Sequence, residues 1–262
     1  MLKNRLIPVL LLKNGLLVRS ENFKVYQIIG NPVDKVKRFN NWNVDELIYL
    51  DISRHDEYDL RRDDHRVKSL TDPLEILDEV SKTCFMPLTW GGRIHNLEDM
   101  RQRISRGADK ITINTAAVKK PKLITQGAEV FGSQAIVVSI DILRHPDGKT
   151  EVLINGGRES TNLKPEAWAR EVENRGAGEI LLNSINRDGT GKGYDIDLIN
   201  AVASATTIPI IACGGVGRYE HYVEGIQAGA SAVAAANIWH FKELPDRNGK
   251  RTLAKAGIEV RL

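Results

Sequence analysis

Two pairs of adjacent glycines, each followed further along by a small polar residue, are the residues that point most directly to chemistry. Gly91-Gly92 follows one short apolar run, and Asn114-Thr115 ends the next run. The C-terminal half repeats this arrangement with Gly214-Gly215 and Ala236-Asn237, preceded by Asp188–Thr190. Glycine-rich loops near helix N-termini present backbone N–H groups that bind phosphate. The sequence therefore predicts two phosphate-binding loops, one in each half.

Either glycine pair alone is typical of an ordinary turn. Phosphate binding is favoured because the pairs recur in an internal repeat. After Gly91-Gly92 comes a helical segment, then Gly107-Ala108 and a strand; after Gly214-Gly215 comes a helical segment, then Gly229-Ala230 and a strand. A two-fold repeat of this kind predicts two similar half-structures. Two phosphate loops opposed across one mouth would hold a substrate that carries phosphate at both ends.

Eight short apolar runs must position these loops. They are Leu6–Leu12, Leu47–Ile52, Met86–Thr89, Ile111–Asn114, Ala135–Asp141, Ile180–Ser184, Ile208–Ala212 and Ala232–Ala236. Continuous apolarity is typical of parallel strands that are buried on both faces. Helical spacing between the runs, as in Pro121–Phe131, gives a strand–helix alternation. With the internal repeat, this predicts one (β/α)8 barrel, or TIM barrel, over residues 1–262, built from two half-barrels.

Composition limits the class of protein. The chain has 262 residues, of which 42% are hydrophobic and 27% charged, and its formal charge of +3 gives no reason to expect a nucleic acid partner. Cys84 and Cys213 lack metal-site spacing and are expected to be reduced core thiols, so neither a metal site nor a cofactor is predicted. The N-terminal apolar stretch is too short for a signal peptide or membrane span, which favours the cytoplasm.

Several motifs closely resemble the cyclase subunit of imidazole glycerol phosphate synthase. They are Arg5–Pro8, Asp45–Leu47 with Leu50–Ile52, Gly107–Lys110, Phe131–Gln134 and Arg187–Thr190, and the similarity runs from Met1 to about Phe241. The resemblance implies a (β/α)8 barrel that forms a heterodimer with a glutaminase subunit. It also implies that ammonia from this partner crosses the barrel core to a bis-phosphorylated substrate at the far end.

The family's phosphate positions map residue by residue onto two sets in this chain. One set is Gly92, Asn114 and Thr115, and the other is Gly189, Gly215, Ala236 and Asn237. Arg19 stands where the family usually has a lysine that contacts phosphate.

The family's gate at the ammonia entrance maps onto four charged residues. Arg5, Glu46, Lys110 and Glu179 all stand at strand starts, hence at the bottom of a barrel, where opposite charges can pair. Any one of them alone would be interpreted as a water-facing charge. Two acids and two bases at matching positions favour a gate. Asp109, beside Lys110, resembles the residue that docks the glutaminase.

The catalytic pair of the family is incomplete here. Its cyclase reaction uses two aspartates as general acid and base, one at the end of the first strand and one at the end of the fifth. Asp141 occupies the fifth-strand position, but Leu11 occupies the first, and leucine cannot transfer a proton. Asp51, at the end of the second strand, is the carboxylate expected to lie nearby as a substitute.

Three further features surround the expected mouth. Residues 54–64 form a long charged loop, which is either solvated surface or a rebuilt mouth. Asn155–Arg158 is expected to form the turn of a small hairpin after the fifth strand, with its tip over the substrate. Trp90, beside the first glycine pair, is expected to narrow the mouth.

Within the family, the runs Val9–Gly15 and Asn183–Ile185 are similar to a side branch associated with glycosyl amidation in surface-polysaccharide clusters. That likeness predicts a subunit that supplies ammonia to a separate sugar-modifying amidotransferase. The alternative is a working cyclase of histidine biosynthesis that relies on Asp141. A third interpretation is a barrel isomerase for a bis-phosphorylated sugar, which would leave the gate residues without a purpose.

Overall fold

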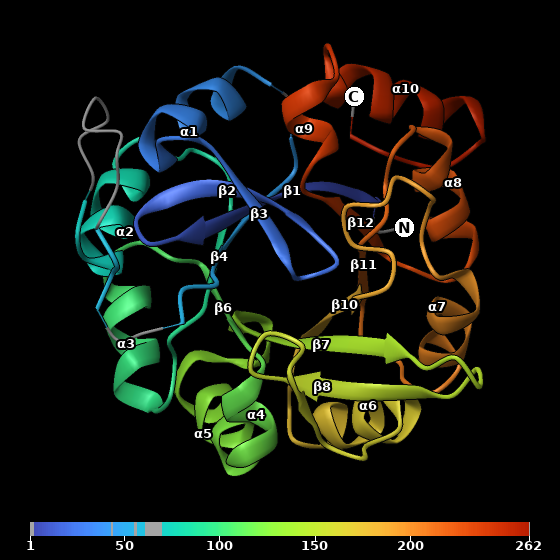
Figure 1. The fold of residues 1–262 in the computed structure, drawn as a ribbon, viewed down its shortest axis with the longest axis horizontal. Coiled ribbons are helices and arrows are strands. Elements are labelled where there is room, and N and C mark those ends of the chain that lie inside the picture. The colour runs from blue at the N-terminus through green and yellow to red at the C-terminus, as the bar shows by residue number, and fades with distance from the viewer. Residues whose placement is uncertain (1–2, 43, 55–56, 61–69, 262) are drawn as a thin grey trace.

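The computed structural model describes residues 3–42, 44–54, 57–60 and 70–261, and within them eight parallel strands close into a barrel (Figure 1). Around the ring they are β1 (Arg5–Lys13), β4 (Leu47–Asp51), β5 (Leu88–Gly91), β6 (Lys110–Ile113), β7 (Ile136–Arg144), β10 (Glu179–Ser184), β11 (Ile210–Cys213) and β12 (Ala232–Ala235). The ring closes because β12 pairs with β1, as Arg5 lies opposite Ala232. The predicted TIM barrel is confirmed.

Helices surround the ring of strands (Figure 1). They are α1 (Pro32–Asn41), α2 (Pro73–Ser81), α3 (Leu97–Ser105), α4 (Thr115–Lys119), α5 (Lys122–Phe131), α6 (Pro165–Asn174), α7 (Ile196–Ala203), α8 (Glu220–Gln227), α9 (Ile238–Phe241) and α10 (Pro245–Lys255). Side-chain caps fix several of their starts, since Asn31, Asp72 and Asn96 each accept a hydrogen bond from a backbone N–H in the first turn. None of the described helices is long and apolar enough to cross a membrane.

Inside the barrel, alternate residues of six of the eight strands form a small apolar core. It contains Ile7, Val9, Ile48, Val137, Leu181, Ile211, Ala232 and Ala234, with Leu11, Leu50, Cys213 and Ala236 packed against it. The larger core lies between the strands and the helices. The branched side chains come from most of the strands, whereas β12 contributes only alanine to the interior. The interior wall along β12 therefore carries only small side chains in this cluster.

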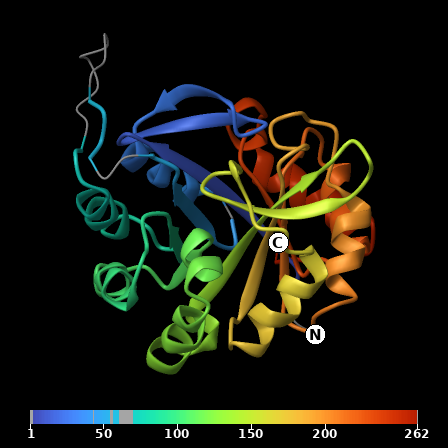
Figure 2. The ribbon, with the colours of Figure 1, turned by 60° about the horizontal axis from the view of Figure 1, so that its bottom comes forward.

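Two antiparallel hairpins extend from the same end of the barrel (Figure 2). One continues β1 into β2 (Leu16–Glu21) and β3 (Val25–Gly30), and the other continues β7 into β8 (Thr150–Ile154) and β9 (Glu159–Ser160). Both begin on repeat-related strands. The predicted hairpin after the fifth strand is thus confirmed, whereas the one after the first strand was not predicted.

Two strands begin later than the apolar pattern indicates. The runs Met86–Thr89 and Ile208–Ala212 start before a proline, and the strands β5 and β11 begin after Pro87 and Pro209. Proline has no N–H to donate to a ladder, so the paired part of each strand follows it. The expectation that Trp90 narrows the mouth is wrong. Its fully buried ring stacks on Tyr49, with centroids 5.4 Å apart, in the layer under the helices.

Candidate functional site

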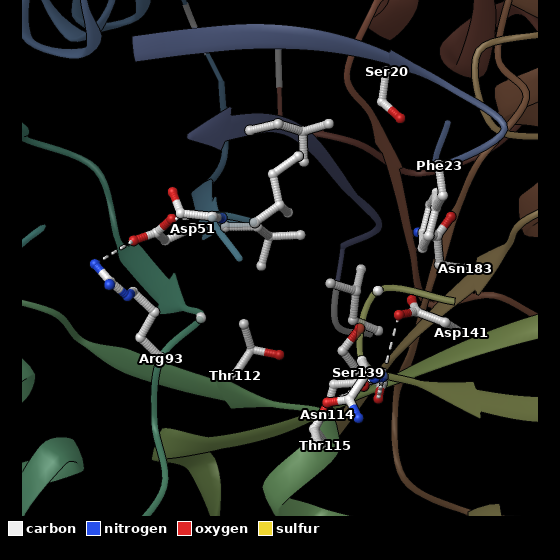
Figure 3. Close-up of a pocket in the computed structure, with 18 of the residues that line it drawn as sticks. Ser20, Phe23, Asp51, Arg93, Thr112, Asn114, Thr115, Ser139, Asp141 and Asn183 are labelled. Carbon is white, nitrogen blue, oxygen red and sulfur yellow. Dashed lines mark hydrogen bonds and ion pairs between the residues drawn. The ribbon is translucent and has the colours of Figure 1, made fainter. Parts of the chain in front are cut away.

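A cavity of about 310 Å³ opens at the carboxyl ends of the barrel strands (Figure 3). Its wall includes Leu11, Asp51, Gly92, Asn114, Thr115, Asp141, Asn183 and Ala236, together with residues of both hairpins such as Tyr26 and Arg158. Parallel barrels carry their sites at this end because the loops after the strands meet there. Much of the predicted site is therefore gathered around one cavity.

Asp141 is a buried carboxylate whose contacts are amides rather than cations. The side-chain amide of Asn114 donates to Asp141 Oδ2 at 3.2 Å, and Asn183 on the neighbouring strand β10 also donates to the carboxylate. Burial raises the pKa of Asp141 to about 7; the Asn183 hydrogen bond opposes this rise and the charge of Asp188 adds to it. A carboxyl group with a pKa near neutrality can both take up and release a proton at the pH of a cell.

Leu11 lines the same cavity from the repeat-related strand β1. It lies opposite Leu50 of β4 in the parallel ladder and opposite Val18 of β2 in the hairpin. The first strand thus contributes the alkyl side chain of Leu11 to the cavity, whereas the fifth strand contributes the carboxyl group of Asp141.

Asp51 lies across the cavity from Asp141 (Figure 3), but its carboxylate is already engaged. One oxygen accepts a hydrogen bond from the backbone N–H of Ser53 at 2.9 Å, and the other accepts one from the Tyr58 hydroxyl at 2.9 Å. The guanidinium of Arg93 lies 3.8 Å from the second oxygen, and the Asp51 side chain is fully buried. With these contacts, Asp51 is better suited to holding the loops after β4 and β5 together than to replacing the missing proton donor.

The first predicted phosphate set lies together on the cavity wall. Gly92 has φ 94°, a conformation that favours glycine, and it packs against the backbone of Asp51. The Thr115 hydroxyl donates to Asn114 Oδ1 at 3.3 Å and accepts from the backbone N–H of Asn155 at 3.0 Å. The turn between β8 and β9 is thereby attached to this set.

The second set surrounds the opposite part of the mouth, with only Ala236 on the cavity wall. Gly189, at φ 71°, packs against the backbone carbonyl of Ser20 in β2, and the Asn237 side chain donates to the same carbonyl at 3.0 Å. The carbonyl of Gly215 accepts a hydrogen bond from Gly193 N–H at 2.8 Å. The β2–β3 hairpin is thus held against the loops that carry Gly189 and Asn237.

Arg19 stands apart from that set. Its Nε donates to Gln27 Oε1 at 2.8 Å, its guanidinium carbon lies 5.7 Å from the centre of the Phe241 ring, and it does not line the cavity. Its predicted contact with phosphate therefore needs a different side-chain conformation.

The four predicted gate residues form a closed ring of ion pairs at the bottom of the barrel. Arg5 Nη1 lies 2.6 Å from Glu46 and 2.9 Å from Glu179, while Lys110 Nζ lies 3.1 Å from Glu46 and 3.2 Å from Glu179. Bases and acids thus alternate around the ring, and the side chains are 8–21% exposed. The two carboxylates raise the pKa of Arg5 against the opposing effect of burial. The four charges are therefore paired with one another rather than isolated at the surface, and their role as a gate stays a prediction.

Asp109 lies outside the ring. It is exposed at the bottom end of the barrel, where one carboxylate oxygen accepts a hydrogen bond from Leu88 N–H at 2.8 Å.

Some cavity residues had not been identified as site residues from the sequence, among them Asn183, Tyr26, Arg54 and Arg158. The turn Asn155–Arg158 was the single signal that could have placed Arg158 there. The charged loop of residues 54–64 lies largely outside the described residues, apart from Arg54 and residues 57–60. No group of three or more potential metal ligands occurs in the part of the chain that the structure describes.

Comparison with known proteins gives a consistent result. Residues 5–245 match the family model described as histidine biosynthesis protein. "Imidazole glycerol phosphate synthase subunit HisF" from Thermotoga sp. (strain RQ2) is 44% identical over 100% of this chain and 99% of its own length. Proteins of the same name from Gluconacetobacter diazotrophicus and Caulobacter vibrioides (strain NA1000 / CB15N) are 44% and 42% identical, over 100% of this chain and 97% of each relative.

Proposed function

Because this chain belongs to the family of histidine biosynthesis proteins, we propose that it is the barrel subunit of a glutamine-dependent complex of the imidazole glycerol phosphate synthase type. In this proposal residues 1–262 act as one barrel domain that receives ammonia from a glutaminase subunit. The observation that carries the proposal is the closed ring of Arg5, Glu46, Lys110 and Glu179 beneath an apolar barrel interior.

The ring and the interior suit the passage of ammonia rather than ammonium. A charged ion that enters an apolar interior without partners loses several kcal/mol of hydration, whereas neutral ammonia loses far less. The ring closes the bottom opening with charge, and above it lies an apolar cluster that includes Ile7 and Val137. Opening one ion pair would admit a small neutral molecule while the remaining charges keep their partners.

At the other end, the two predicted phosphate sets would hold a ligand with phosphate at both ends. Gly92 and Thr115 lie on one side of the cavity, and Ala236 comes from the opposite half of the repeat. Asp141 lies between the sets and would exchange a proton with the group that ammonia attacks.

The comparisons favour a working cyclase subunit in histidine biosynthesis, since each relative described above carries the name of that synthase. In that case Asp141 supplies both proton transfers, in succession, with its near-neutral pKa. This is the alternative that the sequence left open.

Leu11 favours the second candidate, in which the subunit delivers ammonia to a separate enzyme that amidates a surface-polysaccharide sugar. An alkyl group at this position removes one member of an acid–base pair, which typically reduces the rate by ~10²–10⁴-fold. Asp51 is a poor replacement for the missing acid or base, because its carboxylate already contacts Tyr58 and Arg93.

One experiment separates these candidates. The purified chain and its Leu11→Asp variant are assayed with the formimino bis-phosphate substrate of the histidine pathway and excess ammonium salt. Turnover by the natural chain supports the cyclase. A silent natural chain beside an active Leu11→Asp variant supports ammonia delivery.

The glutaminase partnership is tested independently of cyclisation. Binding of the chain should raise the glutaminase activity of a cognate partner, and Asp109→Lys should weaken that binding, because the charge of the proposed docking residue is reversed. Glu129→Lys, at an exposed position on α5, is the matched control. A glutaminase that neither binds nor responds would overturn the proposal and favour an isomerase.

A further inference from the structure

The side chain of His221, in the first turn of α8, joins two loops of the second predicted phosphate set. The loop after β10 contains Gly189, and the loop after β11 contains Gly215. The His221 ring is 4% exposed and lies against Gly193 in the first of these loops, where an added Cβ would be 3.3 Å from the ring. Its Nδ1 accepts the backbone N–H of Gly217, in the second loop, at 3.2 Å. One buried ring therefore contacts both loops.

The two loops also meet backbone to backbone. The carbonyl of Gly215 accepts the N–H of Gly193 at 2.8 Å, and a Cβ at Gly217 would collide with the carbonyl oxygen of Gly191. At these contacts the two loops are too close for a side chain to fit between them. Because Gly217 is two residues from Gly215, the hydrogen bond to His221 helps to determine where Gly215 lies.

The His221 ring faces one donor more than it can accept. Nε of Arg218 points at Nε2 from 2.9 Å, as the Gly217 N–H points at Nδ1. A neutral imidazole has one nitrogen that accepts, because the other carries the proton. Burial is the main cause that lowers the pKa of His221, so the ring is neutral near pH 7. One of the two donors must therefore have another acceptor.

The backbone donor is the one that needs the ring. Gly217 N–H is held in place by the packing of its loop against Gly191. The Arg218 side chain, by contrast, is 64% exposed and can turn towards water. Water replaces a lost acceptor easily for an exposed guanidinium, but not for an N–H that faces a buried ring. The tautomer with its proton on Nε2 satisfies the donor that cannot move.

We propose that His221 is a positioning residue of the second predicted phosphate set, because its Nδ1 holds Gly217, and with it Gly215, where the loop can receive phosphate. Backbone N–H groups bind an anion when they converge on one point, so their orientation determines the affinity. His221 does not line the cavity and would act through the loop. The inference rests on the proposed function, since it takes the second set as the site for one end of a bis-phosphorylated ligand.

Nuclear magnetic resonance of the full chain, titrated with sodium sulfate, tests this role at each set separately. Sulfate is a tetrahedral dianion whose charge stays constant near neutral pH. The backbone amide signals of Gly92 and Gly215 report the first and the second set. His221→Phe keeps a ring but removes the acceptor. Its sulfate affinity at Gly215 should fall by roughly tenfold or more, the scale of an unsatisfied buried donor, while the affinity at Gly92 is unchanged.

His221→Gln is the rescue variant, because its side-chain carbonyl can accept the Gly217 N–H without carrying a titratable ring. Its sulfate affinity at Gly215 should lie close to that of the natural chain. His145→Gln is the matched control, since the ring of His145 pairs with Glu151 on the hairpin of β7 and β8, and it should change neither affinity. An unchanged affinity at Gly215 in His221→Phe would overturn the inference, as would a loss that His221→Gln does not restore.

The position of the proton gives a second measurement, which a general loss of structure would not imitate. Nitrogen-15 spectra of the natural chain near neutral pH should show the His221 proton on Nε2 and an unprotonated, hydrogen-bonded Nδ1. A proton on Nδ1 would overturn the inference, because the Gly217 N–H would then have no acceptor on the ring.

The titration also separates this inference from the proposed function. Sulfate binding at both sets of the natural chain, with no effect of His221→Phe, overturns the positioning role and leaves bis-phosphate binding supported. Sulfate binding at Gly92 alone contradicts a ligand held at both ends and overturns the inference with it. Binding at both sets that weakens only at Gly215 in His221→Phe, and returns in His221→Gln, supports both.

Discussion

The side-chain amide of Asn114 bridges the backbone carbonyl of Ser139, at 3.0 Å, and the carboxylate of Asp141, at 3.2 Å. Asn114 thus contacts Asp141, the proposed proton carrier, and also belongs to the first predicted phosphate set. A phosphate that draws this amide towards itself would weaken a hydrogen bond to the carboxylate. If the first predicted set binds phosphate, ligand binding and the protonation of Asp141 would be coupled through Asn114.

The first prediction concerns Asp141 and pH. Burial raises the pKa of Asp141 from 3.8 to about 7, so the folded state holds a proton that the unfolded state releases between these pH values. Its contribution to stability is therefore full below about pH 4 and is lost as the pH rises towards 7. Asp141→Asn has no such loss. The free energy of unfolding of the variant, relative to the natural chain, should increase by ~1–4 kcal/mol from pH 4 to pH 8 in denaturant titrations. A constant difference across this range would contradict the raised pKa.

The second prediction concerns the ring of ion pairs. Arg5→Gln leaves Glu46 and Glu179 with Lys110 as their remaining partner, and removal of one member of a partly buried network should cost ~1–3 kcal/mol of stability. It should also let ammonia escape at the proposed entrance. The measurements are the midpoint of urea unfolding and the fraction of glutamine-derived ammonia that reaches the acceptor. Glu129→Gln, on the outer surface, should change neither.

The third prediction concerns a buried ion pair that attaches α10 to the start of β4. Lys250 Nζ lies 2.9 Å from Asp45 Oδ1, with side chains 3% and 6% exposed, and Asp45 Oδ2 accepts the backbone N–H of Leu6 at 2.8 Å. Lys250→Met should destabilise the fold by ~3–5 kcal/mol, because it leaves a buried carboxylate without its partner.

The double variant Asp45→Asn/Lys250→Met tests this cause. It removes both charges and keeps a side chain that can accept the Leu6 hydrogen bond, so thermal unfolding should show a smaller loss than for Lys250→Met alone. An equal or larger loss would indicate that packing, rather than the unpaired charge, determines the effect.

The fourth prediction concerns the turn that starts the first hairpin. Gly15 has φ 77°, and a Cβ there would collide with the carbonyl oxygen of Leu70, so Gly15→Ala combines backbone strain with a clash. Gly148 has φ 86° with open space around it, so Gly148→Ala carries the strain alone. We expect Gly148→Ala to lower the free energy of unfolding by ~1 kcal/mol. Gly15→Ala should lower it by clearly more, and chemical denaturation measures both losses. Equal losses would contradict the clash.

The barrel could be predicted from the sequence because its strands are continuous apolar runs. The four charged residues that pair at its bottom, such as Arg5 and Lys110, were identified through the family resemblance, and their role as a gate stays a prediction. The first hairpin was missed although Asn14-Gly15, with φ 51° and 77°, is a strong hairpin signal between apolar residues. Leu11 was instead placed at the end of the first strand, within the run Leu6–Leu12, and no hairpin was predicted after it.

The contacts within the cavity could not be read from local pattern. The Tyr58 and Arg93 contacts of Asp51 join the loops after β4 and β5, and the cavity is lined by Tyr26 and Arg158 from two hairpins that are far apart in the chain. Only the closed barrel determines which of these loops meet.

Because β12 contributes only alanine to the interior cluster, side-chain size is unevenly distributed around the barrel. Branched side chains such as Ile7, Val137 and Leu181 project from three strands elsewhere around the ring, whereas Ala232 and Ala234 leave one flank short of side-chain atoms. A conduit along this flank would run close to the seam where β12 and β1 join the two ends of the sheet. Because alanine is small, one added methyl group at Ala232 or Ala234 would reduce the space available there.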